Sequence, residues 1–156
     1  MNRDGRYAAA GAVGGLVAGA VLSGMMLLLE RSGRGPSDLV LMERRGARGL
    51  GAPHRRMGSA PDTGEQIAGH AGHLLFSTAL GSGLGLLRRG LGTTAPRAGL
   101  VLGLGFYPVA FGLLGPLLGL TRPPWRERPS KIGQNVLLHA VFGAVTGFVA
   151  DRIERR

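Results

Sequence analysis

The stretch that decides the fold is Tyr7–Leu29, which reads YAAAGAVGGLVAGAVLSGMMLLL and contains no Asp, Glu, Lys or Arg. Three further windows lack these charges, namely Gln66–Leu87, Ala98–Thr121 and Ile132–Ala150. At about 1.5 Å of rise per residue, helices of these lengths span roughly 28–36 Å, which matches a bilayer core of about 30 Å. A soluble helix of such length needs a charged face, and these windows have none. The sequence therefore predicts an all-α integral membrane bundle of four transmembrane helices.

The composition alone points elsewhere, because 29 of 156 residues are glycine and the net charge is +10. A basic chain can bind nucleic acid, but every charge of this chain lies between or outside the windows. The arginines are scattered over short segments without interleaved aromatic residues, which favours contact with lipid headgroups. We therefore expect the lipid bilayer as a partner and no nucleic acid. The chain has no cysteine, which excludes disulfides and thiolate metal sites.

The first window is open to a second interpretation, a signal peptide with a cleavage site at Ala18-Gly19-Ala20. Its apolar stretch continues nine residues beyond that site, to Leu29. Since the apolar region of a signal peptide is about 7–15 residues long, we favour an uncleaved membrane anchor.

Small residues recur at four-residue intervals and thus share one face of each predicted helix. Such faces let helix backbones approach closely in lipid, so the sequence predicts helix packing mediated by glycine. The predicted packing positions are Gly11, Gly15, Gly19 and Ser23 in the first window, Ser77, Gly81 and Gly85 in the second, Gly99, Gly103, Gly115 and Gly119 in the third, and Gly143 and Gly147 in the fourth.

Proline marks the third window and the connection after it. Pro108 and Pro116 each remove a backbone donor, so we expect a kinked packing helix there, in preference to the hinge of a gate. Arg122–Lys131 reads RPPWRERPSK, whose three prolines preclude a regular helix. Trp125 in this connection is predicted to be an anchor at the membrane interface. The connection of residues 30–65 is rich in Gly, Pro and Ser and is expected to be a mostly irregular loop, with a short interfacial segment at Leu39–Met42.

Four spans place both termini on the same side of the membrane. The termini and the second connection carry eight Lys and Arg residues, against 11 in the first and third connections. This asymmetry is too small for the positive-inside rule, and the orientation stays open.

A few polar residues inside the windows form a candidate intramembrane polar seam. Histidines on two helices can ligate haem or a metal, or transfer protons near neutral pH. The alternative, which we favour, is that they hydrogen-bond between helices and contribute to packing. No carboxylate lies in any window, so a metal site lacks acidic ligands and a proton relay lacks its usual partner. The seam consists of His70, His73, Gln134, Asn135 and His139.

The second and fourth windows share the pattern H-x-x-F-small-x-x-x-G, which begins at His73 and again at His139, 66 residues later. Such internal symmetry is typical of a duplicated hairpin. The first and third windows do not align at the same offset, so a duplication remains open.

Sequence signatures of catalysis are missing. The chain contains no Walker A motif, no G-x-S-x-G and no H-E-x-x-H. Each of these motifs supplies a phosphate cradle, a nucleophile or a metal site, so we expect a non-enzymatic protein without a cofactor.

Residues Leu118–Trp125 read LGLTRPPW and are followed by His139–Phe142 and a basic C-terminal tail. Together with His73–Ser77, these motifs resemble the YagU-like family of uncharacterised bacterial inner-membrane proteins. The resemblance covers Gly69–Arg156, and the long first loop has no counterpart in it. It implies a small polytopic protein of the bacterial inner (plasma) membrane with no assigned molecular activity and no catalytic residues.

Three functional hypotheses follow. The first is a structural or partner-binding membrane protein that associates with itself or with another membrane protein through its helices. The second is a conduit for protons, ions or small solutes, or an accessory of a transporter, which uses His70, His73 and His139. The third is a carrier of haem held between two histidines.

Overall fold

The computed structural model describes residues 3–31 and 35–155, and within these ranges every regular element is a helix and no strand occurs. The all-α prediction is therefore confirmed. Three stretches of helix are long and apolar enough to cross a membrane by length and composition. They are Asp4–Leu29, Ala95–Leu117 and Pro129–Glu154. These three stretches indicate a membrane protein.

The chain runs through seven α-helices in the described ranges, and the π-helix η2 and the 3₁₀ turn η3 lie between the later ones. The long helices are α1 (Arg3–Leu29), α3 (Thr63–Ser82), α5 (Ala95–Tyr107) and α7 (Pro129–Glu154). The shorter elements are α2 (Asp38–Gly49), α4 (Leu84–Leu91), the π-helix η2 (Pro108–Leu114), α6 (Gly115–Leu117) and the 3₁₀ turn η3 (Pro124–Arg126).

The window Gln66–Leu87 is divided between two helices, because α3 ends at Ser82 and α4 begins at Leu84. The start of α3 is fixed by a capping box, in which the Asp62 side chain accepts from the Glu65 backbone N–H and the Glu65 side chain accepts from the Asp62 N–H. Such reciprocal bonds satisfy two of the free donors at a helix start. Because α3 carries polar side chains, it is not among the three apolar helices.

In the third window the helix changes type at Pro108. The α-helix α5 ends at Tyr107, and Pro108 opens η2 in the wider π-helical register. Proline has no backbone N–H to continue an α-helical ladder, and π-helical turns accommodate such interruptions within a helix. The helix continues as α6, which contains Pro116.

The irregular loop expected over residues 30–65 contains the helix α2, and the expectation is wrong for these 12 residues. Asp38 in the first turn and Arg48 in the last turn interact favourably with the helix dipole. Val40 and Arg44, four residues apart, lie on the same face, and both are buried. The glycines and prolines on either side of α2 begin and end this short helix, where the sequence suggested a longer irregular segment.

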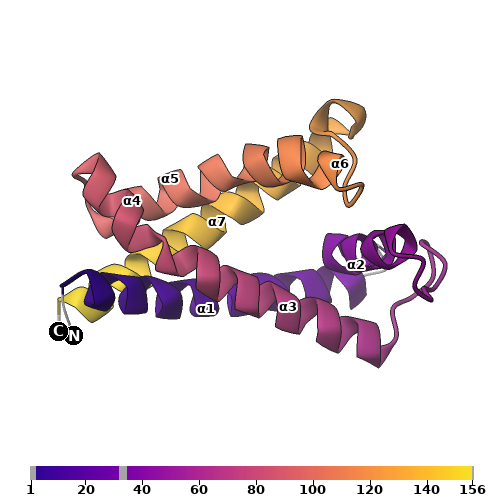
Figure 1. The fold of residues 1–156 in the computed structure, drawn as a ribbon, viewed down its shortest axis with the longest axis horizontal. Coiled ribbons are helices and arrows are strands. Elements are labelled where there is room, and N and C mark those ends of the chain that lie inside the picture. Colours follow the sequence, from indigo (N-terminus) through magenta and orange to yellow (C-terminus); the bar gives the residue numbers. More distant parts are fainter. Residues whose placement is uncertain (1–2, 32–34, 156) are drawn as a thin grey trace.

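The long helices form two hairpins, α1 with α3 and α5 with α7, and α1 also contacts α7 (Figure 1). The start of α1 and the end of α7 lie at one end of the molecule, which we name the terminal end (Figure 1). Helix α2 and the turn after α6 lie at the opposite end, which we name the cap end (Figure 1).

The backbones touch where the helices of each hairpin cross. A methyl group at Gly81 of α3 would lie 2.8 Å from the Cα of Gly15 of α1. A methyl group at Gly99 of α5 would lie 2.8 Å from the Cα of Gly147 of α7. Real Cβ atoms essentially never approach so closely. Any side chain at these positions would therefore push the two helices apart.

The two hairpins repeat one contact scheme. Gly15 meets Ser77 and Gly81, and Gly99 meets Gly143 and Gly147 in the same way. The partners on α3 and α7 are 66 residues apart, as are the first residues of these helices. Gly15 and Gly99 are 84 residues apart, because the first hairpin has 18 more residues between its equivalent positions. The offset of 84 explains why the first and third windows do not align at the offset of 66 that relates the second and fourth.

We expect Gly81→Ala to lower the free energy of unfolding by about 1–3 kcal/mol, because the added methyl group meets the backbone of α1. The matched control is Gly24→Ala on the partner helix α1, where nothing lies within 4 Å. This control is expected to be neutral or stabilising by up to about 1 kcal/mol, since alanine favours helix over glycine. Unfolding in mixed detergent, followed by circular dichroism, measures both values. Equal effects of the two variants would contradict the packing at the crossing.

Candidate functional site

The structure brings three histidines of the polar seam into one neighbourhood. Ser23 Oγ of α1 and His73 Nδ1 of α3 share a hydrogen bond of 3.1 Å. His70 lies one turn before His73 on α3, and His139 of α7 is linked to α3 by the ring contacts of Phe106 with His139 and with Phe76. Since Ser23 is buried, the bond to His73 joins α1 and α3 inside the bundle. The histidines of α3 and α7 are thus neighbours in the fold although they are far apart in the chain.

His139 is fixed from two sides. Its Nδ1–H donates to the backbone carbonyl of Asn135, one turn earlier, at 2.8 Å. In the neutral imidazole this bond leaves Nε2 as an acceptor. The rings of Phe106, Tyr107 and Phe111 surround the imidazole, with centroids 6.1, 5.4 and 5.5 Å away.

The aromatic residues extend the seam to α3, where Phe76 lies 5.4 Å from Phe106 between ring centroids. The sequence analysis missed Phe106, Tyr107 and Phe111. The signal was present, because these aromatic residues lie within four positions of Pro108, in a chain with only five phenylalanines and two tyrosines.

The other polar residues of the seam lie in different surroundings. Both ring nitrogens of His70 are buried without a hydrogen-bond partner among the described residues. Asn135 is buried and supplies the carbonyl that fixes His139. Gln134 is half-buried and does not take part in these contacts.

Several of the predicted packing positions face neighbouring helices, but the prediction is wrong for Gly115 and Gly119. A methyl group at Gly115 would meet Thr121 and Ala110 of its own segment, and Gly119 lies in the turn after α6 with a positive φ and nothing within 4 Å. On α1, Gly11, Gly15 and Gly19 face α3, where they meet Ser77 and Gly81. Gly143 and Gly147 of α7 face α5. Gly85 belongs to α4, and a methyl group there would lie 2.9 Å from the Cβ of Tyr7. Gly14, which was not singled out in the sequence, meets the backbone of Thr146 and joins α1 to α7.

The predicted anchor Trp125 lies in the 3₁₀ turn η3 at the cap end, between Arg122 and Arg126. Its side chain is 74% exposed. An indole in this position is free to enter the headgroup region of a bilayer.

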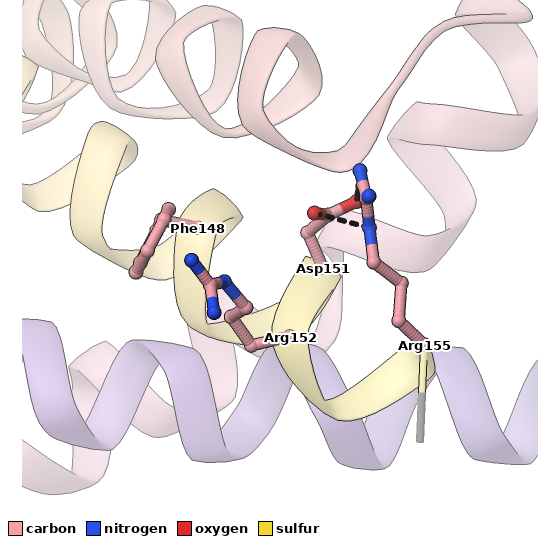
Figure 2. A pocket seen from close by; sticks show the side chains of 4 residues that line it. All are labelled: Phe148, Asp151, Arg152 and Arg155. Carbon is pink, nitrogen blue, oxygen red and sulfur yellow. Dashed lines mark hydrogen bonds and ion pairs between the residues drawn. The ribbon is translucent and has the colours of Figure 1, made fainter.

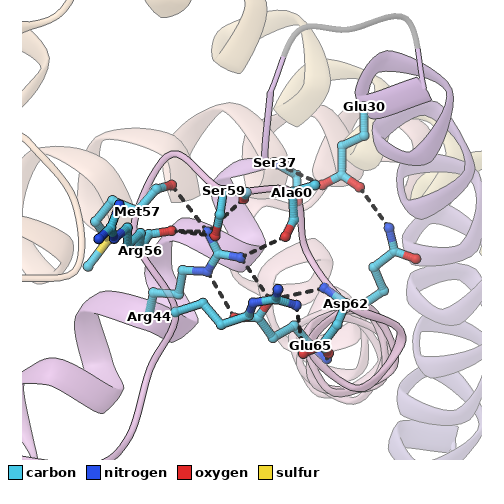
Figure 3. Close-up of polar contacts among 11 residues, drawn as sticks. Glu30, Ser37, Arg44, Arg56, Met57, Ser59, Ala60, Asp62 and Glu65 are labelled. Atoms are coloured by element: carbon cyan, nitrogen blue, oxygen red, sulfur yellow. Dashed lines mark hydrogen bonds and ion pairs between the residues drawn. The ribbon is translucent and has the colours of Figure 1, made fainter.

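A buried arginine organises the cap end, which the sequence analysis did not predict (Figure 3). Arg44 of α2 is 1% exposed and holds both carboxylate oxygens of Glu65, at 2.9 and 2.8 Å. Its remaining donors bind the backbone carbonyls of the segment before α3, namely those of Arg56, Met57, Ser59 and Ala60.

The hydrogen bonds between Arg44 and Glu65 change the acidity of both groups. They hold the pKa of Glu65 below its ordinary value and raise the pKa of Arg44. Each group is therefore charged at neutral pH, and Arg44 is fully paired in spite of its burial.

Helix α2 also connects the two hairpins. Arg45 Nη1 donates to the carbonyl of Leu120, beyond α6, at 2.8 Å. Asp38 forms an ion pair of 2.8 Å with Lys131 at the start of α7. With Arg44 bound to α3, α2 is tied to three separate parts of the bundle.

Two open hollows lie at the ends of the bundle. The hollow at the terminal end has a volume of about 500 Å³ and is formed by Phe148, Asp151 and Arg152 of α7 and by Arg155, the residue directly after this helix (Figure 2). Within it, Arg155 pairs with Asp151 at 2.8 Å and Arg152 lies 4.9 Å from the ring centre of Phe148. Because its walls come from the end of α7 and the residue after it, this hollow is a surface feature. A second hollow of about 430 Å³ lies at the cap end, beside Glu30 and Gln66.

The terminal end is closed by ion pairs between helices. Arg88 of α4 pairs with Glu154 of α7, and its guanidinium lies 5.0 Å from the ring centre of Tyr7. Arg89 pairs with Asp4 at 3.2 Å.

Within residues 3–31 and 35–155, no three His, Asp or Glu side chains are grouped so that they could hold a metal ion. The chemistry open to the polar seam is therefore that of its imidazoles, which can form hydrogen bonds and exchange protons.

Comparison with protein-family models, with curated proteins and with solved structures finds no match for this chain. The resemblance to the YagU-like family therefore stays a prediction.

We expect Arg44→Gln to destabilise the cap end by about 3–5 kcal/mol, because it leaves Glu65 partly buried without its counter-charge. The matched control is Arg55→Gln, whose pair with Asp62 is half-exposed and worth about 0–1 kcal/mol. Amide hydrogen exchange of α2 in detergent measures both effects.

The same pair predicts a pH dependence. Because the pKa of Glu65 is lowered by folding, its contribution is complete above the ordinary carboxyl pKa of 4.5 and is lost as the pH falls below it. The protection factors of α2, which correct for the intrinsic pH dependence of amide exchange, should therefore be lower at pH 3 than at pH 5, a change in the same direction as in Arg44→Gln. A cap that is equally protected at both pH values would contradict the pairing.

Proposed function

We propose that this chain is a multi-pass protein of the bacterial inner membrane, with four transmembrane helices packed through glycine. The spans would be α1, α3 with α4, α5 to α6, and α7. The support is the apolar character of the outward faces, whose large side chains are exposed. In water so large an apolar surface favours aggregation, and in lipid it is favourable. Exposed examples are Val13, Leu16 and Val17 of α1, Leu100, Val101 and Leu104 of α5, and Leu137 and Phe148 of α7.

The fourth span is supported by the position of α3. This helix lies antiparallel beside α1, in contact with it through Gly15 and Gly81 (Figure 1). If α1 crosses the bilayer, α3 is held at the same depth. Its polar side chains then face the interior, as His73 does in its bond to Ser23.

We further propose a non-enzymatic role, in which the protein binds a second copy of itself or another membrane protein. The single observation that carries this role is the outer face of α3. Ala68, Gly72, Leu75 and Ala79 share this face, and all are exposed. Nothing lies within 4 Å of a methyl group at Gly72. Three of these four residues, Ala68, Gly72 and Ala79, are small, and small residues on a helix face favour a second helix in lipid because they permit close backbone approach.

A second candidate function is a conduit for protons, ions or small solutes. The observation that favours it is the group of three histidines, in which His73 holds Ser23 and His139 holds the Asn135 carbonyl. These bonds position imidazoles from two hairpins in one interior region, and imidazole exchanges protons near neutral pH.

The four-span topology can be tested by labelling, because the chain has no native cysteine. An impermeant maleimide labels only the outer face of a vesicle, so inverted and right-side-out vesicles report the two sides of the membrane. We expect Asp4→Cys, Thr93→Cys and Arg155→Cys to react in the same one of these two preparations. Ser59→Cys and Glu127→Cys should react only in the other preparation. A chain in which α3 does not cross would place Asp4 and Arg155 on opposite sides, and that result would overturn the four-span proposal.

The association role predicts that Gly72→Leu lowers self-association or partner binding at least tenfold, because the side chain separates the facing helices. The measurement is energy transfer between labelled copies in vesicles at decreasing protein-to-lipid ratio. Leu117→Ile, at an exposed lipid-facing position, is the control and should leave energy transfer unchanged. The association role is wrong if two results are found together. The first is that wild type shows no energy transfer in vesicles. The second is that wild type binds no other membrane protein that Gly72→Leu fails to bind.

A further inference from the structure

The hollow at the terminal end lies where α7 leaves the bilayer in the membrane arrangement proposed above. The charge-free window of this helix ends at Ala150, and Asp151 and Arg152 are the first charged residues after it. Phe148 and Arg152, four residues apart, share one face of the helix, and both are exposed. Arginine at the end of a span extends its charged head to the level of the lipid headgroups. The hollow therefore opens at the boundary between acyl chains and headgroups.

We propose that this hollow binds the phosphate of an anionic phospholipid, whose acyl chain lies along the outer face of α7. The proposal rests on the membrane location proposed above and adds to it a lipid site on a named surface. The volume of the hollow, about 500 Å³, is within the range of about 300–1,000 Å³ that is usual for sites of small ligands.

The first support is an arginine that is held in place without a carboxylate partner. The guanidinium of Arg152 lies 4.9 Å from the ring centre of Phe148 (Figure 2). Within the described part of the chain, no Asp or Glu forms an ion pair with Arg152. Contact with the aromatic ring orients the planar guanidinium and leaves its N–H donors available. A guanidinium with free donors matches the oxygens of a phosphate, which it can bind through two hydrogen bonds at once.

The second support is that the carboxylates of the terminal end are already paired. Within the hollow, Asp151 pairs with Arg155 at 2.8 Å. Beside the hollow, Glu154 pairs with Arg88, and Asp4 is paired as well. The termini and the second connection hold eight Lys and Arg residues and only these three acids. The surplus positive charge of this end is not balanced within the chain, and anionic headgroups supply the missing charge.

The third support is an apolar face that leads from the hollow toward the middle of the bilayer. Ala144 and Leu137 lie four and 11 residues before Phe148 on the same face of α7, and both are exposed. At about 1.5 Å of rise per residue, Leu137 and Phe148 are about 16 Å apart along the helix, close to half of a bilayer core of about 30 Å. One leaflet has this depth. A phospholipid with its phosphate at Arg152 thus has an apolar surface along its acyl chain, which a soluble phosphate compound leaves unused.

The second hollow, at the cap end, is less suited to an anion. The charged residues that line it are Glu30 and Arg31, so one acid stands against one base. The hollow at the terminal end has two arginines against one acid, and that acid is bound by one of them. The charge of the terminal hollow is therefore positive, and its free arginine is the group that attracts a phosphate.

The test is lipid binding by the full-length protein, measured by native mass spectrometry from detergent. Wild type is titrated with phosphatidylglycerol, which is anionic, and separately with phosphatidylcholine, which carries a phosphate but no net charge. We expect wild type to prefer phosphatidylglycerol by about fivefold or more, and Arg152→Gln to lose this preference, because the free guanidinium is removed. The matched control is Arg48→Gln, an exposed arginine of α2 that forms no ion pair within residues 3–31 and 35–155. It should keep the preference of wild type.

The place of the lipid is tested with phosphatidylglycerol that carries a photoreactive group on its acyl chain. Cross-links are expected on the face of α7 between Leu137 and Phe148, and they should be lost in Arg152→Gln. Circular dichroism spectra identical to wild type show that the exposed substitution leaves the fold intact. Cross-links that persist in Arg152→Gln, or an unchanged preference of this variant for phosphatidylglycerol, would overturn the site.

Two further outcomes separate this site from its alternatives. Inorganic phosphate at millimolar concentration should not displace the lipid, and displacement would show that the hollow takes a soluble phosphate compound instead. The membrane location is measured separately, by flotation of the protein with vesicles at high salt. A chain that does not float overturns the membrane proposal together with the site. A chain that floats but has no preference for phosphatidylglycerol overturns the site alone.

Discussion

The contact on which the rest of the structure depends is that between two backbones at a glycine crossing. In lipid no hydrophobic force draws helices together, so their association depends on close packing and on hydrogen bonds. Helix α1 carries two such surfaces, one with Gly15 toward α3 and another with Gly14 toward Thr146 of α7. Helix α1 therefore lies between α3 of its own hairpin and α7 of the other hairpin. The position of the histidines follows, because the crossing of α1 and α3 places Ser23 beside His73.

The repeated contact scheme places the histidines of the polar seam in the same way in both hairpins. Ser23 and Tyr107 are 84 residues apart, the same spacing as Gly15 and Gly99. Ser23 bonds to His73, and Tyr107 lies 5.4 Å from His139 between ring centroids. Each hairpin thus sets a histidine of its second helix against the same position of its first helix. The 18 additional residues of the first hairpin include the region of α2, so the cap belongs to one hairpin and serves both.

The sequence predicted the all-α class of the fold, because this class depends on local patterns. The absence of charge over Tyr7–Leu29 and similar windows marks apolar helices, and the four-residue spacing of Gly15 and its neighbours marks one face. The sequence could not predict α2, which is shorter than a span and lies among glycines and prolines. It also could not predict the change to a π-helix at Pro108, since proline is compatible with a kink, a break or a change of register.

The role of Arg44 was unpredictable for a different reason. Four of its acceptors are backbone carbonyls, which any sequence provides, and Glu65 becomes its partner only because α2 folds back on α3. This arrangement separates two adjacent residues by function. Arg44 is saturated, so its burial stabilises one conformation of the cap and leaves no donor for another group. Glu43 lies on the same helix but is only partly buried, and its pKa is raised by burial and by the charge of Glu65, although Arg44 lowers it. The pairing that fixes the cap therefore uses the donors of Arg44 and leaves the adjacent carboxyl of Glu43 outside that ion pair.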